Sequence, residues 1–161
     1  MRGMLRAIGV IAVVFTIVAQ FVRITRTNPP VESDVPAPAD VKAALRVACY
    51  DCHSNETTWP WYSHVAPASW LLAYDVSEGR EELDFSTWQR YGAAKQQKKL
   101  KETIETLNDG KMPPWYYSMM HPTARLADKD RQAIIAWANQ GTGGASGAAA
   151  KSAAGSHTDA D

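Results

Sequence analysis

The N-terminus holds the most apolar stretch of the chain. A run from Ala7 to Val22 contains only two polar residues, and Arg2 and Arg6 precede it. At ~1.5 Å rise per residue, a helix over this run is about 24 Å long, slightly short of a ~30 Å hydrocarbon core. A cleaved signal peptide would begin in the same way, but no small-residue cleavage pattern follows the run. We therefore predict an uncleaved, single-pass transmembrane helix within residues 1–26.

Three later segments show the spacing of amphipathic helices. In the first, apolar residues recur at i, i+3, i+4 and i+7 after Asp40, a favourable N-cap. Glycines lie just past the second and third, where helices commonly end. The segments are residues 40–48, 95–107 (followed by Gly110) and 128–139 (followed by Gly141). Since no segment shows the alternation of a strand, we predict an all-α fold.

Two segments lack the pattern of a packed element. Residues 27–38 contain four prolines and little apolar bulk, which predicts a stiff, extended linker that does not pack and that holds the domain off the membrane. Residues 142–161 are low in complexity and lack large apolar side chains, which predicts a disordered tail. One domain of ordinary size remains between them, at residues 39–141.

Charge excludes one class of function. The chain has 17 basic and 17 acidic residues and a formal net charge of zero, which gives no basis for nucleic-acid binding. The predicted helix at residues 95–107 nevertheless has a lysine-rich face, formed by Lys95, Lys98, Lys99 and Lys101. We interpret this face as solvated surface, with a docking site for an acidic redox partner as the alternative.

The chemistry of the chain is concentrated in Cys49-Tyr50-Asp51-Cys52-His53. A C-x-x-C-H motif is typical of covalent c-type haem, whose vinyl groups react with the two thiols and whose iron binds the histidine. A redox dithiol would also contain C-x-x-C, and a structural zinc site would need a second pair of ligands. Neither alternative explains the histidine that directly follows Cys52, so the motif predicts one covalent haem c with His53 as the proximal ligand.

A haem that only transfers electrons also needs a sixth iron ligand. Met112 is our first candidate because Pro113 and Pro114 stiffen the turn that follows it. His121 and His64 are the second and third candidates. The alternative for Met112 is that it is an ordinary methionine of the hydrophobic core.

Aromatic residues follow the motif in a stretch without helical periodicity. Trp59, Trp61 and Tyr62 could cover the haem edge or contact its propionates, and ordinary core packing is the alternative. They are candidates for haem contact.

Several stretches together resemble the haem-binding domain family: CYDCHSN, PASW, DVSEGREELDFSTW, GKMPPWYYSMMHP and the final helix. Members of this family are small, often membrane-anchored bacterial proteins with one c-type haem. The order of haem motif, methionine turn and last helix also resembles class I cytochromes c. That resemblance implies that helices 40–48 and 128–139 cross beside the haem, and that the Pro67 carbonyl accepts the N–H of His53. It implies no role for residues 77–91.

The sequence thus predicts a small cytochrome c-like helical domain around one haem, behind a single transmembrane helix. Because c-type maturation takes place outside the bacterial cytoplasm, we expect the domain in the periplasm and the anchor in the inner membrane. The predicted function is electron transfer between redox partner proteins, since no catalytic constellation is evident. The alternative is a haem-based sensor or peroxidase-like protein whose open distal site is lined by His64, His121 or Arg80.

Overall fold

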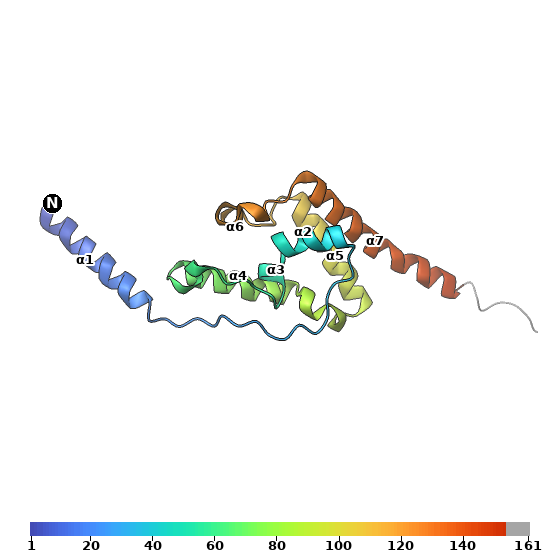
Figure 1. The fold of residues 1–161 in the computed structure, drawn as a ribbon, viewed down its shortest axis with the longest axis horizontal. Coiled ribbons are helices and arrows are strands. Elements are labelled where there is room, and N and C mark those ends of the chain that lie inside the picture. The colour runs from blue at the N-terminus through green and yellow to red at the C-terminus, as the bar shows by residue number, and fades with distance from the viewer. Residues whose placement is uncertain (154–161) are drawn as a thin grey trace, which may run out of the picture.

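The fold is all-helical, as the sequence predicted (Figure 1). The computed structural model describes the backbone of residues 1–153 and the side chains of residues 1–142. No strand occurs within residues 1–153. The α-helices are α1 (Arg2–Ala19), α2 (Ala39–Ala48), α3 (Tyr50–His53), α4 (Ala68–Glu82), α5 (Ala93–Asn108), α6 (Trp115–Met120) and α7 (Asp128–Ala153). Short 3-10 helices are η1 (Trp61–His64), η2 (Phe85–Arg90) and η3 (Pro122–Ala124).

The core forms where α2, α5 and α7 meet. Leu45 and Ile134 are fully buried there, and Leu100 and Leu107 of α5 join the same cluster. Complete burial of such a side chain contributes about 1.5–3 kcal/mol relative to exposure. The predicted packing of the first domain helix on the last is confirmed, because α2 lies directly against α7.

Helix α7 is longer than the sequence predicted. The pattern predicts an end at Asn139, but the helix continues through Gly141 to Ala153. Gly141 does not terminate the helix but allows close packing, because a Cβ there would lie 2.4 Å from Leu100 Cδ1. The following residues are rich in alanine, the best helix former. The predicted disordered tail therefore begins inside a helix, and its residues 154–161 lie outside the described residues.

Residues 27–38 are extended but not unpacked, so the predicted free linker is wrong. This segment, which we call the strap, runs along the domain (Figure 1), from the loop at Thr57, before η1, to α7. Val35 is fully buried in the core, and Trp137 Nε1 of α7 donates a hydrogen bond to the Pro36 carbonyl at 3.0 Å. Glu32 of the strap also pairs with Arg90 of η2. The prolines keep the segment extended, and its side chains bind it to the domain.

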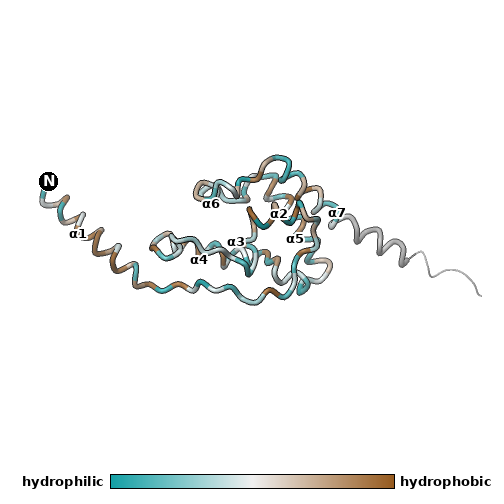
Figure 2. Tube along the Cα trace, in the orientation of Figure 1, coloured by the Kyte–Doolittle hydropathy of each residue, from teal (hydrophilic) through white to brown (hydrophobic). Residues whose placement is uncertain are grey.

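Helix α1 projects from the domain and is coloured largely hydrophobic in Figure 2. It has 18 residues, a mean hydropathy of 1.9 and only 6% buried residues. Within the described chain it is the one helix long and apolar enough to cross a membrane, judged by length and composition.

Candidate haem site

One turn of helix brings the motif side chains together. Helix α2 ends at Ala48, and the φ of −126° at Cys49 redirects the chain into the short helix α3. The His53 N–H donates to the Cys49 carbonyl at 2.8 Å, which closes this turn. Residues three and four apart share one helical face, so Cys49, Cys52 and His53 all face one cleft.

His53, the predicted proximal ligand, is held by two carbonyls. His53 Nδ1 lies 2.8 Å from the Gly79 carbonyl and 3.0 Å from the Leu83 carbonyl. Because carbonyls only accept, the proton belongs on Nδ1 and Nε2 keeps a free lone pair. Through residue 142, no described side chain forms a hydrogen bond with Nε2. Burial lowers the pKa of His53 although both carbonyls raise it, which favours the neutral imidazole that a metal ligand requires.

Pro67 does not have the role that the resemblance implied. Its carbonyl accepts the N–H groups of Trp70 and Leu71 at 3.0 and 3.3 Å in the first turn of α4. The prediction for Pro67 is therefore wrong. The acceptors lie at the other end of α4, in the segment 77–91, for which the sequence predicted no role.

Gly79 is the residue that permits this arrangement. A Cβ at Gly79 would lie 2.6 Å from the Cys52 carbonyl oxygen and 3.0 Å from its carbonyl carbon and Cβ. Helix α4 can therefore approach α3 closely enough to reach His53 only because residue 79 lacks a side chain. Sequence reasoning missed this residue, although an isolated glycine inside a helical segment was a usable signal.

The motif opens onto an apolar cleft made of two adjoining cavities, with volumes of about 280 and 160 Å³. Both are bounded by Ala48, Cys49, His53, Glu82 and Met112. The larger cavity extends into the core and the smaller one toward α6. Their remaining apolar and aromatic walls include Leu45, Leu83, Phe85, Leu107, Ile134, Tyr116 and Tyr117.

Met112 faces the same cleft as His53. The preceding α5 ends as predicted before Gly110, which has a left-handed φ of 65°. Met112 lies in the turn between α5 and α6, is 38% exposed and borders both cavities. Within the described chain, no other methionine or histidine besides His53 lines either cavity. The cleft therefore contains two thiols, an imidazole Nε2 and a thioether, a donor set that fits haem.

The competing histidines lie elsewhere. His121 Nε2 forms a hydrogen bond with the Tyr62 hydroxyl at 2.5 Å, and its ring stacks on Tyr117 at 4.3 Å. His64 lies near the end of α1, in a polar cavity with Arg23. Neither histidine borders the cleft.

The predicted aromatic shell also lies outside the cleft walls. Trp59 Nε1 donates to Asn28 of the strap at 3.2 Å. Trp61 is 75% exposed, and with Tyr62 it lines a separate cavity beside α6. The aromatic residues that do border the cleft are Phe85, Tyr116 and Tyr117.

Arg80 forms hydrogen bonds with the loop after the motif and does not line a distal pocket. Its guanidinium donates to the carbonyls of Ser54 and Thr27 at 2.8 and 2.9 Å. It also donates to the side chains of Asn28 and Thr57 at 3.1 and 2.9 Å. Arg80 thus binds α4, the loop and the strap together.

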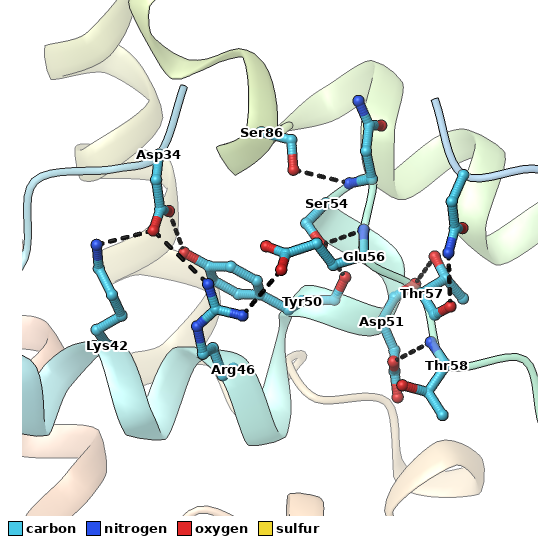
Figure 3. Close-up of polar contacts among 12 residues, drawn as sticks. Asp34, Lys42, Arg46, Tyr50, Asp51, Ser54, Glu56, Thr57, Thr58 and Ser86 are labelled. Carbon is cyan, nitrogen blue, oxygen red and sulfur yellow. Dashed lines mark hydrogen bonds and ion pairs between the residues drawn. The ribbon is translucent and has the colours of Figure 1, made fainter. Parts of the chain in front are cut away.

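The two middle residues of the motif fix α3 in place (Figure 3). Tyr50 is buried, stacks on Phe85 at 5.1 Å and donates its hydroxyl proton to Asp34 of the strap. The Asp51 carboxylate accepts the Thr58 N–H at 2.8 Å and the Tyr117 hydroxyl at 2.7 Å. Sequence reasoning missed both roles because the partners are distant in the chain.

Lys99 is a cation in the wall of the larger cavity, although the sequence pattern predicts a place on a solvated face. Its side chain is 10% exposed, and Nζ lies 3.1 Å from Glu102 and 3.5 Å from Glu82. Burial lowers the pKa of Lys99, but the two carboxylates outweigh that effect and raise it. Among the described cleft residues it is the one positively charged side chain.

The thiols do not have the environment of a redox dithiol. Burial, with smaller contributions from neighbouring negative groups, raises the pKa of Cys49 and of Cys52 to about 12. Reactive dithiols instead require a lowered pKa. Within the described residues, no group of three His, Cys, Asp or Glu side chains could hold a metal ion such as zinc.

The fold and the cleft define a small helical protein that presents a C-x-x-C-H motif to an apolar, haem-compatible cleft. Comparison with family models agrees: the model described as "Haem-binding domain" matches residues 14–140. The chain belongs to this haem-binding domain family, and it is a haem-binding protein. Comparison with curated proteins and with solved structures gives no match.

Proposed function

We propose that this protein is a mono-haem c-type cytochrome that transfers electrons between redox partner proteins. One observation carries the proposal: Cys49, Cys52, His53 and Met112 border a single apolar cleft. In this proposal Cys49 and Cys52 would hold the haem covalently through thioether bonds, and His53 and Met112 would bind its iron.

The chain supports these roles in distinct ways. Haem, when bound, supplies one-electron oxidation and reduction at its iron. The carbonyls of Gly79 and Leu83 orient His53 and increase the basicity of Nε2. The apolar walls limit access of water to the cleft.

Electron transfer, and not substrate chemistry, follows if Met112 closes the distal side. A thioether ligand stays bound in both oxidation states and raises the reduction potential. The residues proposed for an open distal pocket, His64, His121 and Arg80, do not border the cleft. This placement favours the cytochrome over a haem-based sensor or a peroxidase-like protein.

The proposed location follows from covalent attachment and from α1. We place α1 in the bacterial inner membrane and the haem domain in the periplasm, where c-type haem is attached. An alkaline phosphatase fused behind the C-terminus would then be active in cells. An inactive but expressed fusion would contradict this orientation.

A spectroscopic experiment tests the function. The full-length chain, produced with c-type maturation and purified from membranes, should keep haem under denaturing conditions, and Cys49→Ser with Cys52→Ser should abolish this retention. Ferric protein should be low-spin with a methionine–iron charge-transfer band. Met112→Ala should lose that band, whereas Met120→Ala, outside the cleft walls, should keep it. A native high-spin iron that binds carbon monoxide at once would overturn the proposal.

A further inference from the structure

An exposed apolar patch covers one end of the haem domain. We define it by Trp61 of η1, Val65 just after η1, Leu71 of α4, and Met119 and Met120 of α6. Their exposed fractions are 75, 44, 50, 58 and 54%, respectively. All five line the same shallow cavity of about 390 Å³, so they form one surface. Contiguous exposed patches of this kind mark interaction sites.

The patch lies where α1 joins the domain. The Gln20 amide, just past the end of α1, accepts the Ala66 N–H at 3.0 Å and donates to the Ala66 carbonyl at 3.3 Å. Ala66 lines the same cavity as the patch residues. Arg26 adds a hydrogen bond from its guanidinium to the Ser63 carbonyl at 2.9 Å. Figure 1 shows α6 and the first turn of α4 at the end of the domain nearest α1.

This attachment determines the level of the patch relative to a bilayer. Gln20 lies near the end of the apolar run, three residues before Arg23. If α1 spans the hydrocarbon core, Gln20 is at the headgroup boundary, and Ala66 is at the same level. The patch around Ala66 then reaches the membrane surface without any movement of the domain.

The side chains suit that environment. Tryptophan, leucine and methionine partition favourably into the headgroup and acyl boundary, and nearby basic groups interact with anionic lipid. Arg23, Arg26 and His64 border a polar cavity next to the patch. We propose that this patch rests on the lipid bilayer, so that the domain lies against the membrane and is not held away from it. The inference requires α1 to be in the membrane but does not depend on the identity of the axial ligands.

Spin-label accessibility in the full-length holoprotein tests the inference. A nitroxide is attached to Met119→Cys, to Ile11→Cys within α1, and to Val47→Cys, an apolar residue of α2 that is 50% exposed and outside the patch. The protein is reconstituted into vesicles of phosphatidylcholine and phosphatidylglycerol. Accessibility to oxygen is then compared with accessibility to a water-soluble nickel complex.

We expect lipid-like accessibility at Met119 and Ile11, with an oxygen-to-nickel ratio several-fold higher than at Val47. A label at Met119 that is as water-accessible as that at Val47, while Ile11 is in lipid, overturns the inference alone. A water-accessible Ile11 overturns the anchor together with the inference. Shielding at Met119 that persists in detergent and disappears on dilution would assign the patch to a second copy of the chain and also overturn it. The absorption spectrum of each labelled variant serves as the control for an intact haem site.

Discussion

Gly79 provides the sharpest test of how the site is built, through the variant Gly79→Ala. In an exposed helix this substitution would stabilise the protein by about 1 kcal/mol. Here the added Cβ would lie 2.6 Å from the Cys52 carbonyl oxygen. That oxygen belongs to the backbone of α3 and cannot rotate away, so α4 and α3 must separate. Overpacking of this kind costs about 1–3 kcal/mol, and we expect the clash to outweigh the gain in helix propensity.

The separation should also move the Gly79 carbonyl away from His53 Nδ1, which lies 2.8 Å from it. We expect the free energy of unfolding to fall by about 1–2 kcal/mol and the melting temperature by about 5–10 °C. Chemical denaturation of the holoprotein, followed by circular dichroism, measures the first quantity. The visible spectrum and the reduction potential report the change at His53.

A matched control separates packing from backbone effects. A Cβ added at Gly92, at the start of α5, would have no heavy atom of another segment within 4 Å. Gly92→Ala should therefore change stability by no more than about 1 kcal/mol and leave the spectrum unchanged. If Gly79→Ala were as stable as the native protein with an unaltered potential, the close approach of α4 to α3 would not be what holds His53.

Two further variants and one control test the strap and the loop it contacts. Burial raises the pKa of Asp34, but hydrogen bonds from Lys42 and Tyr50 outweigh this and hold it below its ordinary value of 3.8. Its contribution to stability is therefore present above pH ~4 and is lost as the pH falls through the lower folded-state pKa. Asp34→Asn should lower the free energy of unfolding by about 1–2 kcal/mol at pH 7. Urea titrations should show that the difference in unfolding free energy between this variant and the native protein shrinks below pH ~4. A difference that does not change with pH would contradict this. Arg80→Met should cost about 2–3 kcal/mol by the same assay because it removes four hydrogen bonds. Arg90→Met, which removes an exposed pair, should cost about 1 kcal/mol or less, and equal losses would refute the assignment of Arg80.

The parts of the structure that the sequence predicted are those with local signals. The apolar face of α2 carries its own period, and the C-x-x-C-H spacing needs only one helical turn. Met112 is the first candidate in sequence because the prolines after it are adjacent, and the structure places it in the cleft; its bond to iron remains a prediction.

The parts that were missed depend on contacts between distant segments. The acceptors of His53 are backbone carbonyls, which have no sequence signature. Pro67 was assigned as the acceptor only because its position matches that of the proline in class I cytochromes c. The prolines of the strap predict an unpacked linker because they indicate only that the segment is stiff. They carry no information about the burial of Val35 in the core. Gly141 predicts a helix end because a glycine that allows close packing looks the same in sequence as one that terminates a helix.

The packed strap would have a kinetic consequence for the proposed membrane-bound cytochrome. A free chain of a dozen residues could extend about 40 Å and let the domain swing between partners, which would raise its local concentration at each of them. The strap has no such reach, because contacts from Asn28 to Pro36 hold it to the domain. Any molecule that exchanges electrons with the proposed cytochrome must therefore travel to the cleft, either by lateral diffusion in the membrane or as a mobile carrier from the aqueous side.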